Sequence, residues 1–114
     1  WIKWSEQREL RELDKGNLVF VEFTAKWCLI CQSNKKLVLQ TDFVRKLFDN
    51  NNIVPMVADW TKRDQEIENT LEGYGRSGVP LYVLIKPDKS FRVLPQSLSK
   101  EAIKQEIELF LNVK

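Results

Sequence analysis

The sequence predicts an α/β domain with a four-stranded mixed sheet, helices on both faces of that sheet and a helix at the N-terminal end. Apolar, β-branched segments alternate with amphipathic segments in the order helix, strand, helix, strand, helix, strand, strand, helix. The right-handed crossover rule makes the first two strands parallel neighbours, and the closing hairpin must then complete the sheet on the other side of the first strand. The chain has 114 residues, so we expect one domain, 1–114.

The first half of the chain supplies the first crossover. A weakly amphipathic helix over 4–15 should end at Gly16. Residues 18–24 are nearly all apolar and rich in β-branched and aromatic side chains, as is typical of a central strand covered on both faces. A helical pattern then runs from 28 to about 39, and Thr41 is expected to cap a further helical piece.

The second half begins with a strand over 53–59 and a helix. Residues 61–64 resemble a capping box with Asp64 in place of the usual Glu, and the apolar face of the following helix is formed by Ile67, Leu71 and Tyr74.

The chain should close with a hairpin and a final helix. Strands over 81–85 and 91–94 are joined by a segment with turn chemistry. Ser99 should cap the last helix, with Leu98 packing on Ile103 as a hydrophobic staple. Its buried stripe is predicted to be Ile103, Ile107, Phe110 and Leu111.

Composition excludes several classes of function. The 18 basic and 16 acidic residues are interleaved, which indicates a solvated surface, a monomer and no nucleic-acid partner. The chain has no His, which excludes Cys–His proteases and His-ligated metals. Its apolar runs are far shorter than the roughly 20 residues of a membrane helix. It starts at Trp1 without an initiator Met or a signal segment, so we expect a domain cut from a longer protein or a processed chain.

The two cysteines, Cys28 and Cys31, are the most informative residues. They lie three positions apart, directly after the first predicted strand, where a helix should begin. Backbone N–H groups at a helix start favour thiolate over thiol, so Cys28 is predicted to attack disulfides and Cys31 to resolve the mixed disulfide. One alternative is a structural staple, although closing so short a loop removes little entropy from the unfolded chain. A zinc half-site is another, but the chain offers no further Cys or His as ligands.

Two neighbours of the cysteine pair are candidate site residues. Glu22 lies in the apolar first strand, where burial would raise its pKa, and it is predicted to accept a proton from Cys31 during exchange. The alternative is a Glu at a sheet edge that simply reaches solvent. Trp27 is predicted either to shield the sulfur and contact partners or to act only as a packing aromatic.

Three separated segments carry a resemblance to a known family. They are residues 21–32 with the cysteine pair, Ala58-Asp59-Trp60-Thr61, and residues 75–82 with Gly78-Val79-Pro80. With these segments the chain resembles thioredoxin-like proteins along nearly its full length, and most closely the C-terminal periplasmic domain of DsbD-type thiol:disulfide interchange proteins.

The resemblance implies a role and further site residues. A cis peptide bond is expected before Pro80, which would turn the Val79 backbone toward an extended partner segment. A rigid loop proline is the alternative. Lys35 departs from the family, because members of this branch can carry an acidic residue there. It lies four residues after Cys31 and would share its helix face, where a cation favours thiolate.

Three hypotheses for function follow. The leading one, implied by the resemblance, is a reductase domain on the periplasmic face of the bacterial inner membrane. It would pass electrons from a transmembrane donor domain of the same parent protein to oxidised periplasmic thioredoxin-like proteins, as in cytochrome c biogenesis, with the Cys28–Cys31 disulfide and no other cofactor. The second is a free-standing thioredoxin or an oxidant. The third is a redox-inactive module that binds client proteins beside Val79 and Pro80.

Overall fold

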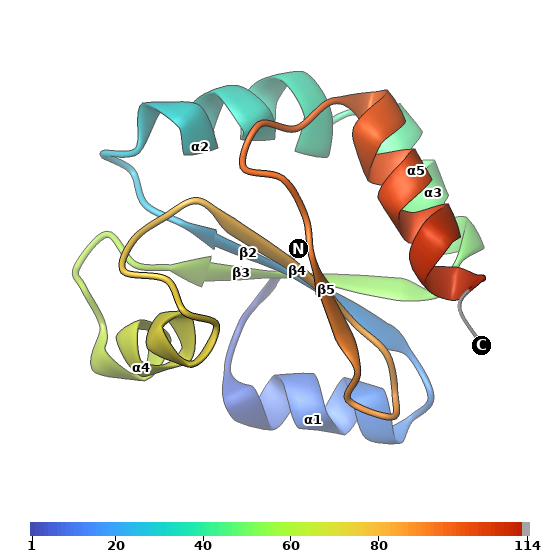
Figure 1. Ribbon diagram of the computed structural model, residues 1–114, viewed down its shortest axis with the longest axis horizontal. Coiled ribbons are helices and arrows are strands. Elements are labelled where there is room, and N and C mark those ends of the chain that lie inside the picture. The colour runs from blue at the N-terminus through green and yellow to red at the C-terminus, as the bar shows by residue number, and fades with distance from the viewer. Residues whose placement is uncertain (113–114) are drawn as a thin grey trace.

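A five-stranded mixed sheet lies between two layers of helices in this computed structural model, which describes residues 1–112 (Figure 1). The strand order across the sheet is β1-β3-β2-β4-β5. The strands are β1 (Ile2–Lys3), β2 (Leu18–Thr24), β3 (Ile53–Asp59), β4 (Leu81–Ile85) and β5 (Phe91–Val93). The helices are α1 (Glu6–Asp14), α2 (Leu29–Asn34), the π-helical segment η1 (Lys35–Leu39), α3 (Asp42–Asn50), α4 (Gln65–Gly73) and α5 (Lys100–Leu111).

The topology confirms the expected connections and adds one strand. β2 pairs in parallel with β3 and antiparallel with β4, and β4 pairs antiparallel with β5, as the crossover and hairpin required. The prediction of four strands was wrong, because β1 adds a fifth by pairing with Met56 and Val57 of β3. A strand of two exposed residues is too short to leave an alternating pattern in the sequence.

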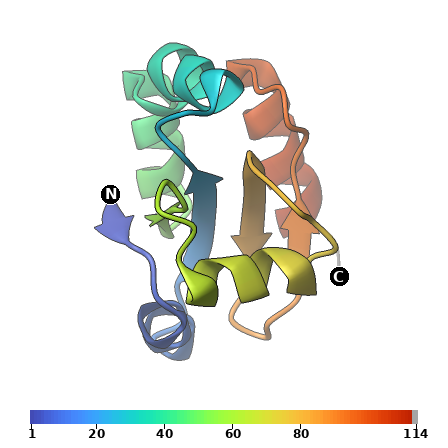
Figure 2. The same cartoon turned by 90° about the vertical axis from the view of Figure 1, so that its left-hand side faces the viewer.

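Each face of the sheet buries its own core. The two views of the ribbon show helices on both sides of the sheet (Figures 1 and 2). α1 and α4 cover one face, and α2, α3 and α5 cover the other. β2 is therefore a central strand whose residues 19–24 are all buried. The prediction for the α5 stripe holds for Ile103, Ile107 and Phe110 but was wrong for Leu111, which is 37% exposed.

Two predicted helix caps are confirmed, and one predicted capping motif is wrong. Thr41 and Ser99 cap α3 and α5 by accepting hydrogen bonds from Val44 N and Ala102 N. The predicted capping box at 61–64 was wrong, because α4 is capped by Asp64, whose carboxylate accepts from Ile67 N at 3.1 Å. Thr61 is used elsewhere, as described below.

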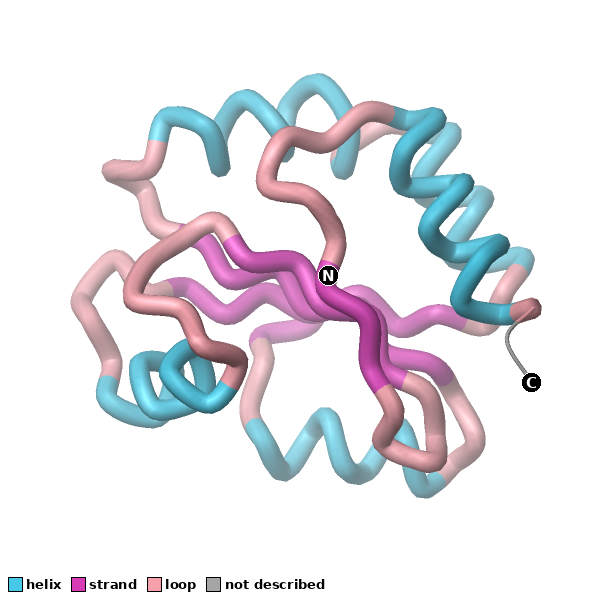
Figure 3. Tube along the Cα trace, viewed as in Figure 1, coloured by secondary structure: helices cyan, strands magenta, loops and turns pink. Residues whose placement is uncertain are grey.

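The segment after β5 crosses from the sheet to the start of α5 close to α2 (Figure 3). Asn34, at the end of α2, is 6% exposed and holds this segment close to the helix. Its amide nitrogen donates to Tyr82 OH at 2.9 Å and to the Gln96 carbonyl at 2.7 Å, and its oxygen accepts from Leu98 N at 3.2 Å. The helix that carries the cysteines is thereby tied to both β4 and the last connection.

Candidate functional site

Cys28 and Cys31 form a disulfide at the junction between β2 and α2. Cys28 is the residue before the first turn of α2, and Cys31 lies inside that helix with a Cα–Cα separation of 5.2 Å. The Cys28 side retains 9% exposure, whereas Cys31 is fully buried. Cys28 is therefore the more accessible of the two cysteines to an incoming partner.

The start of α2 places a backbone hydrogen-bond donor beside the sulfur of Cys28. The N–H of Cys31 donates to Sγ of Cys28 at 3.2 Å, as it would to the oxygen of a capping Ser or Asp. After reduction the same donor and the positive end of the helix dipole favour a thiolate on Cys28. This asymmetry favours the predicted order of roles, with Cys28 attacking, which stays a prediction.

Val79, the residue before Pro80, lies against the cysteine pair. The Val79–Pro80 peptide bond is cis, as the resemblance implied. Val79 is half-buried and packs on a small apolar cluster of Ala25, Cys28 and Cys31, while Pro80 is buried. The structure thus brings together two segments that are about 50 residues apart in sequence.

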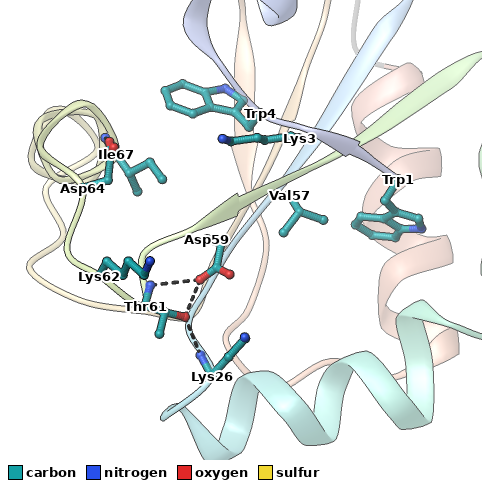
Figure 4. A pocket seen from close by; sticks show the side chains of 10 residues that line it. All are labelled: Trp1, Lys3, Trp4, Lys26, Val57, Asp59, Thr61, Lys62, Asp64 and Ile67. Carbon is teal, nitrogen blue, oxygen red and sulfur yellow. Dashed lines mark hydrogen bonds between the residues drawn. The ribbon is translucent and has the colours of Figure 1, made fainter.

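A hydrogen-bonded latch from the end of β3 holds the loop before Cys28 (Figure 4). The hydroxyl of Thr61 accepts from Lys26 N at 2.9 Å, and the Thr61 carbonyl accepts from the indole N–H of Trp27 at 3.2 Å. Asp59 orients Thr61 by accepting from both its hydroxyl and its N–H. The segment Asp59-Trp60-Thr61 carried part of the family resemblance, but its action on the cysteine loop was not predicted.

Trp27 is half exposed and stacks into a small aromatic group. Its ring lies 5.9 Å from that of Trp60, and the Arg63 guanidinium lies 5.2 Å from the Trp27 ring and 4.8 Å from the Trp60 ring. Cation–π contacts of this kind fix the orientation of an exposed indole. Arg63 was missed at the sequence level, because its backbone is in the left-handed region at φ 56° and no local pattern signals that.

Large apolar side chains stand exposed around Cys28. The exposed fractions are 49% for Trp27, 84% for Leu29 and 55% for Ile30. Solvent-exposed apolar groups clustered beside a reactive atom are typical of a docking surface for another protein.

Glu22 is buried in the central strand, so the alternative of a solvent-reaching edge Glu was wrong. The residue is 1% exposed, and its Oε2 has no hydrogen-bond partner. Burial raises the pKa of the Glu22 carboxyl to about 7, the positive charge of Lys35 opposes that rise, and the negative charge of Asp59 adds to it. A carboxyl with such a pKa can both accept and release a proton near neutral pH.

Metal binding and membrane spanning receive no support from the described residues. Within 1–112 there is no group of three or more Cys, His, Asp or Glu side chains placed to hold a metal ion. No helix within the same range has the length and apolar character needed to cross a bilayer.

Comparisons with known proteins agree with this geometry. A family model described as thioredoxin-like matches residues 1–87. Among solved structures, the oxidised C-terminal domain of DsbD from Neisseria meningitidis is similar with a TM-score of 0.77 at 19% identity, covering 96% of this chain and 98% of that chain. A thioredoxin from Thermus thermophilus is similar with a TM-score of 0.78 at 18% identity, covering 97% and 88%.

A third similar structure is a DsbH oxidoreductase, with a TM-score of 0.78 at 16% identity, covering 99% of this chain and 86% of that chain. At such identities these likenesses show the fold alone. A search of curated proteins gave no match.

Proposed function

Since the chain belongs to the thioredoxin-like family, we propose that it is a thiol:disulfide oxidoreductase that works in the reductase direction. The observation that carries this proposal is the Cys28–Cys31 disulfide at the start of α2, with Cys28 9% exposed and Cys31 fully buried. Family and disulfide together point to thiol:disulfide exchange. The direction and the partners are the further steps proposed here.

The reaction begins when the Cys28 thiolate attacks a disulfide of the partner. A bond forms between Cys28 Sγ and one partner sulfur, and the other partner sulfur leaves with the electron pair and takes up a proton. Cys31 then loses its proton to Glu22 and attacks Cys28 Sγ. The Cys28–partner bond breaks, the partner leaves as a second thiolate, and two electrons have moved from the domain to the partner.

Val79 and the apolar residues around Cys28 supply binding for the partner. The Val79 backbone, turned by the cis bond before Pro80, can pair with an extended segment through main-chain hydrogen bonds, which accept many sequences. Trp27, Leu29 and Ile30 add exposed apolar area beside the attacking sulfur.

The similarity to a DsbD C-terminal domain favours particular partners. On this proposal a transmembrane domain of the same parent protein reduces Cys28–Cys31 at the periplasmic face of the inner membrane. The reduced domain then passes the electrons to oxidised periplasmic thioredoxin-like proteins.

The exposed apolar surface also favours a second candidate, a client-binding module in which the disulfide stays closed. Trapping with single-cysteine variants separates the two. Reduced Cys31→Ser, mixed with insulin as a disulfide-bonded test protein, should accumulate a covalent adduct on a non-reducing gel, because nothing resolves the mixed disulfide. Cys28→Ser should form far less adduct, and the wild type should turn over without accumulation.

The outcomes distinguish the candidates. Adduct formation by Cys28→Ser in place of Cys31→Ser would reverse the assigned roles. The reductase proposal would be overturned if neither variant formed an adduct while both bound unfolded insulin chains non-covalently as well as the wild type does. That result would support the client-binding module.

A further inference from the structure

A groove of about 530 Å³ is formed by the N-terminal segment, the end of β3 and the start of α4 (Figure 4). Its size falls within the range of roughly 300–1,000 Å³ that is typical of ligand-binding clefts. Its apolar wall includes the half-exposed ring of Trp1 and the buried side chains of Trp4 and Ile67. Neither cysteine lines it, so the groove is a surface additional to the apolar residues that surround Cys28.

Three lysines from separate segments surround the groove (Figure 4). Lys3 lies on β1, Lys26 in the loop before Cys28 and Lys62 in the connection from β3 to α4. All three are exposed, and within residues 1–112 none of their ammonium groups forms an ion pair or a hydrogen bond. Their positive charges can therefore pair with a ligand.

The two aspartates that line the groove are already bound within the fold. Asp59 accepts hydrogen bonds from both the hydroxyl and the N–H of Thr61. Asp64 accepts from Ile67 N at 3.1 Å and caps α4, where the positive end of the helix dipole offsets its charge. The lysines thus remain the charged groups of the groove that can pair with an incoming anion.

We propose that this groove binds an acidic, extended segment of the partner protein, next to the disulfide that Cys28 attacks. The inference rests on the proposed function and gives its partner a chemical character. The carboxylates of the segment would lie among the three lysines, and its methylene groups would pack on the apolar wall. A Glu side chain uses both features of the groove, whereas a small inorganic anion uses only the charges.

The groove continues into the surface around Cys28. Thr61 lines the groove, and its hydroxyl and carbonyl accept hydrogen bonds from Lys26 N and from the indole N–H of Trp27. Lys26 is two residues before Cys28, and two residues span at most about 7 Å. A segment bound at Cys28 therefore reaches the edge of the groove within about two or three residues. The Arg63 guanidinium adds a further positive charge over the Trp27 ring.

Exposed charges of this kind act mainly on the rate of association. Complementary charges speed the encounter of two molecules more than they tighten the complex, and salt screens them. The groove should therefore make Cys28 react faster with disulfides that are flanked by acidic residues. This preference should fade as the salt concentration rises.

The kinetic test compares two peptides, each with one cysteine joined in a disulfide to 2-nitro-5-thiobenzoate. One peptide carries Glu at the third and fourth positions on each side of the cysteine, and the other carries Gln there. When Cys28 attacks the peptide sulfur, a bond forms between these two sulfurs, and thionitrobenzoate leaves with the electron pair as a coloured thiolate. Reduced Cys31→Ser protein isolates this step.

We expect the Glu peptide to react roughly fivefold to tenfold faster than the Gln peptide at about 20 mM salt. The ratio of the two rates should fall to about two or less at about 0.5 M salt, where screening is strong. A ratio near one at low salt would overturn the inference.

Two triple variants of the Cys31→Ser protein test whether the groove is responsible. The groove variant replaces the three lysines of the groove by Gln and should lower the ratio of the two rates to about two or less. The control variant removes the same net charge from three exposed lysines outside the groove, Lys36→Gln, Lys46→Gln and Lys89→Gln. It should keep most of the ratio. Equal falls in the two variants would show a general effect of net charge and would overturn the inference.

A binding measurement separates this inference from the proposed function, because it needs no cysteine chemistry. The oxidised protein is titrated with the same peptides, with Ser in place of their cysteine, while ¹⁵N NMR follows the backbone amides of Lys26 and Lys62. Both amides should shift with the Glu peptide and stay unchanged with the Gln peptide. Shifts without any release of thionitrobenzoate in the kinetic test would support the groove and overturn the proposed function.

Two other outcomes overturn the inference alone. One is release of thionitrobenzoate at equal rates from both peptides, with no amide shifts. The other is an equal set of shifts with free succinate at the same carboxylate concentration, which would identify a site for small anions in place of a docking site for a partner segment.

Discussion

Glu22 is a titratable residue buried in an apolar strand, where its charged form is destabilised. It sits on a central strand, 1% exposed, with one carboxylate oxygen that has no partner. A buried carboxylate costs stability in its charged form, and such groups are found where their uptake and release of a proton serves a function. The sequence revealed the anomaly, because one Glu interrupts an otherwise apolar strand.

The first prediction concerns stability against pH. The Glu22 pKa is about 7 in the folded protein against an ordinary value of 4.5, so the folded protein holds a proton that the unfolded chain has released in between. Titration of Glu22 should lower the free energy of unfolding by about 3 kcal/mol as pH rises from about 4.5 to about 7, and this contribution should then level off. Glu22→Gln should lose this fall, as measured by urea unfolding of the oxidised proteins at pH 5 and pH 8.

A matched control is Glu101→Gln, which alters an exposed carboxylate in the first turn of α5. It should retain the wild-type dependence on pH. If Glu22→Gln also retained it, the buried carboxylate would not titrate as described.

At the scale of elements, the helix that carries the cysteines is held at both ends. The latch from Asp59 and Thr61 holds the loop before it, and Asn34 holds its end against β4 and the last connection. A π-helical segment, η1, follows directly and carries Lys35, which lines a cavity together with Glu22. The position of the disulfide thus depends on side chains far from it in sequence.

The second prediction is a loss of stability in Asn34→Ala. The substitution leaves the buried Tyr82 hydroxyl, the Gln96 carbonyl and Leu98 N without their partner, which should cost about 3 kcal/mol in urea unfolding. Asn69→Ala, which removes an exposed amide on α4, should change stability by less than about 0.5 kcal/mol. Similar losses of stability in both variants would contradict this role of the Asn34 hydrogen bonds.

The third prediction concerns the latch. Thr61→Val keeps the shape of the side chain but removes the acceptor for Lys26 N, so hydrogen exchange of the Lys26 amide should speed up by roughly fivefold to tenfold. Thr70→Val, which removes a hydroxyl bonded within α4, should leave that amide unchanged. An unchanged Lys26 rate in Thr61→Val would show that the hydroxyl does not hold the loop.

Elements with strong patterns were predictable, whereas those that depend on tertiary contacts were not. The strands at 18–24, 53–59 and 81–85 match the structure residue for residue. Short, continuous apolar runs between turn signals are typical of buried strands. β1 was missed because two exposed residues carry no period. The capping box failed because Thr61 bonds to Lys26, 35 residues away, in place of its own helix.

At the scale of the whole molecule, the two layers of helices bury an apolar core on each face of the sheet. Glu22 lies opposite Tyr82 across β2 and β4, on the face whose core contains Tyr82. The sequence predicted the cysteine pair, Glu22 and the loop at Pro80 as separate signals. Only the fold shows that Val79 packs on the cysteine pair, and the cavity that Glu22 and Lys35 line left no mark in the sequence.

The central claim is that Cys28 and Cys31 form a reversible couple that donates electrons. The most direct measurement equilibrates the purified domain in graded dithiothreitol buffers, alkylates free thiols and counts them by mass. We expect a single two-thiol transition at or below the potential of thioredoxin, about −270 mV. A transition near −120 mV, the value of a strong oxidant, or no reversible transition at all would contradict the reductase account.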